Sequence, residues 1–260
     1  MKTIILCGGT GTRMKEETEF KPKPLVEIGG KPMLWHIMKI YSHYGYNEFV
    51  LALGYKGNMI KEYFLNWRGL LNDFTLSTST NELTFHNNDC DDFKITFAET
   101  GSDSLTGERV LRAAKYLDDG PFMVTYGDGV SDVNIKELVD FHKSQKTIGT
   151  ITGVRPSSRF GLLNIHPETK KAVDFFQHNI TDNVDRSSDY INGGFMVFEK
   201  EMLNMLAHDS MVETVFAPLS QQDQLSVYTH SGQWKCMDTV KEAEELNKMW
   251  SSDPFWKIWK

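Results

Sequence analysis

Glycines and cationic side chains gather in one short stretch near the start of the sequence. Gly8, Gly9 and Gly11 leave the backbone uncovered, so that its N–H groups can approach phosphate oxygens. Arg13 adds a guanidinium fork whose geometry suits phosphate. Two lysines follow in the run Lys21-Pro22-Lys23-Pro24, whose prolines stiffen the backbone that carries them. This combination of residue types predicts a site for a polyphosphate.

Two familiar phosphate-binding loops do not fit this stretch. A P-loop requires Gly-Lys-Ser/Thr after four intervening residues, and the chain has no such sequence. The dinucleotide fingerprint requires glycine or alanine at position 14, where the chain has Met14. The glycines alone fit an ordinary turn beside solvated lysines, whereas Arg13 and the Lys-Pro-Lys-Pro run favour phosphate binding.

Two aspartates are candidates for binding a metal ion. Asp128 stands between glycines after the apolar run Phe122–Thr125, and Asp238 lies between an expected strand and the last long helix. Ligands of open α/β sheets bind at the carboxyl ends of parallel strands, where Asp128 is expected. Two hard oxygen ligands that converge on a triphosphate suit Mg²⁺. Each aspartate alone also fits a turn or a helix N-cap, Asp238 especially because it precedes Thr239.

The elements that must position these residues alternate between strand and helix in the first half of the chain. This alternation is typical of parallel βαβ units, and it predicts an α/β, Rossmann-like, doubly wound mixed sheet. The expected strands are Thr3–Cys7, Phe49–Leu53, Ile95–Ala98 and Phe122–Thr125. The expected helices follow Pro32 as far as about Gly45 and then cover Asn58–Leu65, Leu105–Tyr116 and Asn134–Gln145.

The second half has closely spaced strands and less helix between them. Strands are expected at Gly149–Val154, Leu162–Ile165, Ala172–Phe176, Tyr190–Phe198 and Leu225–Tyr228. Helices are expected at Lys200–Ala207, Met211–Gln222 and Val240–Trp250. We interpret 1–260 as a single domain with one shared sheet. Residues 1–135 would form a nucleotide-binding half, 136–238 a β-rich acceptor-binding half, and 239–260 a C-terminal helix and aromatic tail.

The aromatic tail leaves two interpretations open. Trp250, Phe255, Trp256 and Trp259 are spaced so that they could share one face. That face fits packing onto the chain's own domain and a contact between subunits equally well.

Composition excludes several classes of protein. The 260 residues are 40% hydrophobic and 24% charged, as in folded globular proteins, and the net charge of -7 disfavours nucleic acid and anionic membrane partners. No apolar stretch approaches the roughly 20 residues of a membrane span, and the apolar start reaches Gly8 too soon for a signal peptide. Three distant cysteines form neither a disulfide framework nor a zinc-spaced pair, and Cys7 is expected to be a small buried residue. These features predict a cytoplasmic protein.

Several motifs together resemble the sugar-phosphate nucleotidylyltransferase family. The general ones are Gly8–Arg13, Lys21–Pro24 and Ile28–Pro32. The ones that are more similar to glucose-1-phosphate cytidylyltransferases are Leu34–Lys39, Gly54–Gly57, Thr106-Gly107 with Arg109, and Thr125–Val130. The resemblance covers nearly the whole chain and is densest before residue 135.

The resemblance implies an activity and a set of site residues. The activity is the joining of CTP to a sugar 1-phosphate, with release of pyrophosphate, by a homo-oligomer that makes a CDP-sugar for surface polysaccharide. It implies that Asp128 and Asp238 hold Mg²⁺, that Arg13 stabilises the departing pyrophosphate, and that Lys23 lies near the reacting α-phosphate. The implied nucleotide-binding residues are Gly8, Gly9, Gly11, Thr12, Arg109 and Gly127, and the implied acceptor-binding residues are Asn192 and Gly193.

The acceptor half departs from the family pattern at one run. Family members have Glu-Lys-Pro after a strand that ends in phenylalanine, whereas this chain has His178 and Asn179 at the Glu and Lys positions. A lost charge-assisted contact to phosphate is worth roughly 1.5–3 kcal/mol. Either a nearby cation replaces it, with Arg155, Arg159, Lys170 and Lys171 as candidates, or the acceptor differs. The alternatives are therefore a cytidylyltransferase for another phosphorylated acceptor and an inactive nucleotide-sugar-binding paralogue.

Overall fold

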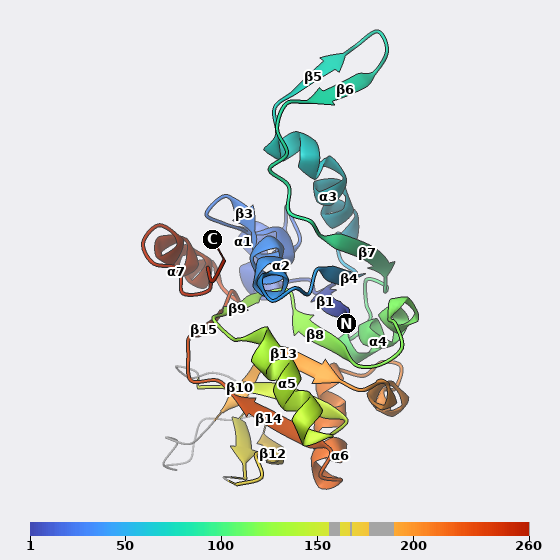
Figure 1. Ribbon diagram of the computed structural model, residues 1–260, viewed down its shortest axis with the longest axis vertical. Coiled ribbons are helices and arrows are strands. Elements are labelled where there is room, and N and C mark those ends of the chain that lie inside the picture. Colours follow the sequence, from blue (N-terminus) through green and yellow to red (C-terminus); the bar gives the residue numbers. More distant parts are fainter. Residues whose placement is uncertain (156–161, 167, 177–189, 260) are drawn as a thin grey trace.

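A seven-stranded mixed sheet forms the centre of the molecule (Figure 1). The computed structural model describes residues 1–155, 162–166, 168–176 and 190–259. The strand order is β14-β10-β13-β8-β1-β4-β7. In chain order the strands are β1 (Thr3–Cys7), β4 (Glu48–Leu53), β7 (Lys94–Glu99), β8 (Phe122–Tyr126), β10 (Gly149–Val154), β13 (Ile191–Phe198) and β14 (Leu225–Thr229).

Strand direction divides the sheet into two connected parts. β8, β1, β4 and β7 run parallel to one another, as βαβ crossovers require. β13 runs antiparallel to both β8 and β10, and β10 pairs in parallel with β14. The predicted Rossmann-like mixed sheet is therefore confirmed. The first and the second half of the sequence both contribute strands to it.

Helices cover both faces because the strands are apolar on both sides. In β1, Ile5 and Cys7 face one core while Ile4 and Leu6 face the other, as the two-residue period of a strand requires. The first core contains residues of α2 (Met33–His43), α3 (Gly57–Leu71), α5 (Ile135–Gln145) and α7 (Val240–Trp250). The second contains residues of α4 (Thr106–Ala113) and α6 (Phe216–Gln221). Among the described residues, no helix is long and apolar enough to cross a membrane.

The structure differs from the sequence-based elements mainly outside the sheet. A hairpin of β5 (Phe74–Ser77) and β6 (Glu82–Phe85) was not predicted, and it projects beyond α3 (Figure 1). The helix predicted at Lys200–Ala207 is a 3-10 helix, Lys200–Met205, and α6 is preceded by a second one, Val212–Val215. Two further small pairs, β2 (Glu27–Ile28) with β3 (Lys31–Pro32) and β11 (Leu162–Ile165) with β12 (Ala172–Phe176), lie outside the central sheet.

The aromatic tail packs onto its own chain. Trp256 is 1% exposed, and its indole N–H donates to Nδ1 of the buried His36, 3.3 Å away. Trp250 and Trp259 also contact the His36 ring. This observation supports the first of the two interpretations of the tail. The homo-oligomer implied by the family resemblance stays a prediction.

His36 is held in its neutral form by two opposite hydrogen bonds. Its Nε2 lies 2.8 Å from the Ile28 carbonyl and donates to it, while Nδ1 accepts from Trp256. Burial lowers the pKa of His36 to about 4. A proton on Nδ1 would place two N–H groups against each other, so the packing of α2 depends on an uncharged ring.

We therefore expect the protein to lose stability in mild acid. Since the folded pKa of His36 lies below its unfolded value of about 6.5, its contribution is complete above pH 6.5 and is lost as pH falls towards 4. The total is on the order of 3 kcal/mol. Urea unfolding between pH 7 and pH 4 should show a shallower pH dependence for His36→Gln than for wild type. His43→Gln, on the exposed side of the same helix, is the control, and equal slopes in all three proteins would contradict the assignment.

Candidate active site

A small antiparallel ladder brings the two predicted metal-binding aspartates together. Asp128 directly precedes β9 (Gly129–Ser131), and Asp238 follows shortly after β15 (Trp234–Cys236). The two strands pair with Gly129 opposite Cys236, and the N–H of Met237 donates to the carbonyl of Asp128 at 2.8 Å. Residues far apart in the sequence therefore present their carboxylates at the same place, beside the carboxyl end of β8.

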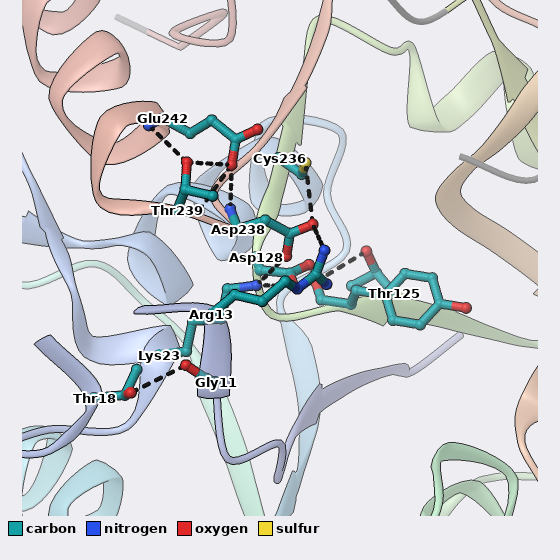
Figure 2. Close-up of polar contacts among 11 residues, drawn as sticks. Gly11, Arg13, Thr18, Lys23, Thr125, Asp128, Cys236, Asp238, Thr239 and Glu242 are labelled. Carbon is teal, nitrogen blue, oxygen red and sulfur yellow. Dashed lines mark hydrogen bonds and ion pairs between the residues drawn. The ribbon is translucent and has the colours of Figure 1, made fainter. Parts of the chain in front are cut away.

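Lys23 joins these carboxylates (Figure 2). Its Nζ lies 2.6 Å from Asp128 Oδ2 and 2.6 Å from Asp238 Oδ1. It begins a short 3-10 helix, Lys23–Leu25, whose N-cap is Pro22, so the Lys-Pro-Lys-Pro run fixes the backbone as predicted. Arg13 reaches Asp238 from the other side, with 3.0 Å between its NH1 and Oδ2. The structure thus groups two cations with two carboxylates.

Burial strengthens the electrostatic interactions between the charges of this group. The side chains of Lys23 and Asp238 are only 12% and 9% exposed, whereas Arg13 is 69% exposed. Burial lowers the pKa of the Lys23 ammonium, but the charges of Asp128 and Asp238 and their hydrogen bonds outweigh it, and the net pKa is raised. Lys23 therefore stays protonated at neutral pH, and its single positive charge is shared between the two carboxylates.

A cavity of about 340 Å³ opens beside this group. It is lined by every residue predicted to bind nucleotide or metal or to act in catalysis, namely Gly8, Gly9, Gly11, Thr12, Arg13, Lys23, Arg109, Gly127, Asp128 and Asp238. A Cβ on Gly9 would meet nothing within 4 Å, so the space in front of its backbone is open. Gly11 turns the loop with a φ of 63°, which favours glycine. The loop therefore presents backbone and cations to the same cavity.

Arg109 connects the glycine-rich loop to neighbouring segments through hydrogen bonds. Its buried guanidinium donates to the carbonyls of Gly8, Leu53, Gly101 and Ser102 and to the Thr100 hydroxyl, at distances from 2.7 to 3.1 Å. A Cβ on Gly8 would lie 2.1 Å from the guanidinium, which explains glycine there. These bonds give Arg109 a positioning role for two loops of the cavity wall, and a direct nucleotide contact stays a prediction.

Another wall combines residues of β8 and α4 with the segment before α6. Met211 lines the cavity together with Tyr126 and Thr106, and the Tyr126 hydroxyl donates to Oε1 of Glu213. The N–H of Val212 donates to the Thr106 hydroxyl at 2.9 Å. Burial, followed by the charge of Glu213, raises the pKa of Tyr126 well above its ordinary value, so its phenol remains a donor. This wall joins α4 to the segment before α6.

The predicted acceptor residues lie behind Tyr126. The side chain of Asn192 lies near the Tyr126 phenol, and its Oδ1 accepts from the Gly194 N–H at 2.9 Å. The carbonyl of Gly193 accepts from the Trp234 indole at 2.8 Å. Neither Asn192 nor Gly193 lines the 340 Å³ cavity, so their contact with an acceptor stays a prediction.

The donor set fits a magnesium ion. Asp128 and Asp238 are hard oxygen ligands that converge, and the Lys23 ammonium stands as a cation between them. Among the described residues, no group of three or more histidine, cysteine or acidic side chains could hold a metal by itself. Two carboxylates with the remaining positions left to phosphates and water are typical of Mg²⁺ rather than of a structural metal.

Several residues have roles that the sequence did not distinguish. Tyr126 belongs to a motif, but nothing in the sequence indicated its bond to Glu213. Thr239, not Asp238, caps α7 in a capping box with Glu242, so the N-cap alternative for Asp238 is not observed. Lys21 pairs loosely with Glu27, 3.9 Å away, instead of joining Lys23. The run containing His178 and Asn179, and also Arg159, lies outside the described residues.

The fold and the site define a class of protein, and comparison with known proteins identifies it. Residues 2–251 match the family model described as nucleotidyl transferase, and the chain belongs to that family. Over its whole length it is 44% identical to the probable glucose-1-phosphate cytidylyltransferase of Bacillus subtilis and 40% identical to the glucose-1-phosphate cytidylyltransferase of Salmonella typhimurium, and both relatives are covered completely. The resemblance inferred from the motifs is confirmed.

Solved structures confirm the fold. A putative glucose-1-phosphate thymidylyltransferase from Bacillus anthracis superimposes with a TM-score of 0.75 at 17% identity, covering 100% of this chain and 97% of its own. HddC from Yersinia pseudotuberculosis superimposes with a TM-score of 0.73 at 21% identity, covering 96% of this chain and 99% of its own.

We expect Arg109→Lys to destabilise the protein by about 2–3 kcal/mol, because several buried acceptors would lose a donor that one ammonium cannot replace. Urea unfolding measures the difference. Arg112→Lys is the matched control: it lies one turn away on α4, is 47% exposed, and should cost well under half as much. Equal losses in the two variants would contradict the positioning role of Arg109.

Proposed function

We propose that this protein is a cytidylyltransferase that joins CTP to a sugar 1-phosphate resembling glucose 1-phosphate, giving a CDP-sugar and pyrophosphate. The observation that carries the proposal is the buried group of Lys23, Asp128 and Asp238 beside the glycine-rich loop. The full-length relatives named as glucose-1-phosphate cytidylyltransferases support the choice of base and acceptor.

The reaction needs charge neutralisation more than proton transfer. An oxygen of the acceptor phosphate forms a bond to the α-phosphorus of CTP while the bond from that phosphorus to the pyrophosphate oxygen breaks. The nucleophile is already an anion at neutral pH, so no general base is required. Because one anion approaches another, positioned cations lower the barrier. Lys23 would hold the α-phosphate, and the exposed Arg13 would stabilise the departing pyrophosphate.

Mg²⁺ is part of the proposal, with Asp128 and Asp238 as the residues that would hold it. When bound, the ion would supply positive charge to the phosphate oxygens and orient the triphosphate. Lys23 contacts the same carboxylates, so its ammonium would lie beside both the ion and the phosphate that it is proposed to hold. The glycine-rich loop would meanwhile bind phosphate oxygens through its backbone N–H groups.

Pyrophosphate release with each nucleoside triphosphate, measured against a panel of phosphorylated acceptors, tests the activity. We expect release with CTP and glucose 1-phosphate. A strong response with UTP or dTTP and none with CTP would contradict the base assignment. Release only with other phosphorylated alcohols or acids would favour the alternative acceptor, and nucleotide binding without any release would favour an inactive paralogue.

Two substitutions test the roles of the charged group. We expect Lys23→Ala and Asp128→Asn each to lower turnover by about 10²–10³-fold, since a preorganised charge is lost, while CTP affinity changes only a few-fold. In addition, the rise in melting temperature on adding Mg²⁺ should disappear in Asp128→Asn. Lys21→Ala is the control, two positions from Lys23 and outside the group. Full activity or an unchanged magnesium response in Asp128→Asn would remove its metal role.

A further inference from the structure

Glu213 is a partly buried carboxylate that forms no ion pair with any residue that the structure describes. Within the described part of the chain, its contacts are the Tyr126 hydroxyl on Oε1 and the Thr106 hydroxyl, 3.5 Å from Oε2, and no lysine, arginine or histidine forms an ion pair with it. Local departures from the usual pairing of charges tend to lie at functional sites. Oε2, with one long contact, can still accept further hydrogen bonds.

The Glu213 carboxylate lies next to residues that line the cavity of the candidate active site. Both of its partners line the cavity, and Tyr126 lies two residues before Asp128 on the same strand and loop. Met211, from the same segment as Glu213, lines the cavity too. Arg13 and Lys23, by contrast, belong to the glycine-rich loop. The cavity therefore has cations on one wall, and on another the side chains of Tyr126 and Thr106, whose hydroxyls contact the carboxylate of Glu213.

The Tyr126 side chain is held firmly enough to fix Glu213. A Cβ on Gly194, whose φ is 82°, would lie 2.6 Å from the Tyr126 ring, so the ring packs directly against that backbone. Glu213 is thus bound by a hydroxyl from β8 and lies beside the first turn of α4.

We propose that Glu213, positioned by Tyr126, binds hydroxyl groups of the acceptor and selects a neutral polyhydroxylated monophosphate over an acceptor that carries a second acidic group. This inference rests on the proposed function. Sugar hydroxyls are donors that a carboxylate accepts strongly. The same charge repels anions, so it directs the phosphate of the acceptor towards Lys23 and disfavours a carboxylate at the other end. Sugar acids are therefore poor acceptors for this site.

Glu213→Gln tests the inference, because the amide retains the shape of the side chain and removes its charge. With saturating CTP, we expect the KM for glucose 1-phosphate to rise about tenfold with kcat nearly unchanged. The ratio of kcat/KM for glucose 1-phosphate to that for glucuronic acid 1-phosphate should fall about tenfold as well. Glu201→Gln, an exposed glutamate in the 3-10 helix Lys200–Met205, makes the same charge change away from the cavity and should alter neither value.

Tyr126→Phe separates positioning from charge. It removes the hydroxyl that holds Glu213 but keeps the ring and the carboxylate, so KM for glucose 1-phosphate should rise while the discrimination against glucuronic acid 1-phosphate persists. CTP affinity close to that of wild type verifies that each variant is folded. Unchanged KM and unchanged discrimination in both variants would overturn the role of Glu213 alone. No pyrophosphate release by the wild type with any acceptor would overturn the proposed function and this inference together.

Discussion

The ammonium of Lys23 between two carboxylates is the interaction on which the rest of the site depends. A buried lysine 2.6 Å from Asp128 and Asp238 is possible only if three distant segments meet within hydrogen-bond distance. The loop after β1 supplies the cation, the end of β8 supplies one carboxylate, and the β9–β15 ladder supplies the other. Because β1 and β8 are adjacent parallel strands, their carboxyl ends already lie side by side, and the small ladder completes the group.

The two carboxylates and two cations balance one another, which explains how so many charges are tolerated where water is scarce. Removing Lys23 would leave the buried Asp238 carboxylate beside Asp128 with only the exposed Arg13 to compensate them, which is strongly destabilising. The same balance prepares the site for phosphates. Arg13 is mostly exposed, and its ion-pair partner among the described residues is Asp238, so it can exchange that carboxylate for an incoming anion at little cost in desolvation. The buried Lys23 is the fixed member, and the exposed Arg13 is the exchangeable one.

Local patterns in the sequence were sufficient to predict the strands of the sheet and the glycine-rich loop. Apolar runs such as Thr3–Cys7 and Phe122–Tyr126 encode buried strands without reference to the rest of the chain. By contrast, the convergence of Asp238 on Asp128 depends on a ladder of three residue pairs, too short to leave a periodic signal. Arg109 could be placed on a helix, but its five acceptors lie at the end of β4 and in loops whose paths only the tertiary structure determines. Contacts between distant segments therefore account for most of what sequence reasoning missed.

The two walls of the cavity differ in the same way, because one depends on residues close in sequence and the other on contacts between distant segments. The loop wall depends on residues close in sequence, Gly8 to Lys23, clamped by Arg109. The other wall depends on contacts between distant segments, such as Tyr126 with Glu213 and Val212 with Thr106. Substitutions in the segment before α6 can therefore change what lies beside Tyr126 without moving the loop that carries Lys23. With the acceptor bound beside Tyr126 and the nucleotide beside Lys23, as proposed, such an arrangement lets the acceptor site diverge while the charged group stays the same.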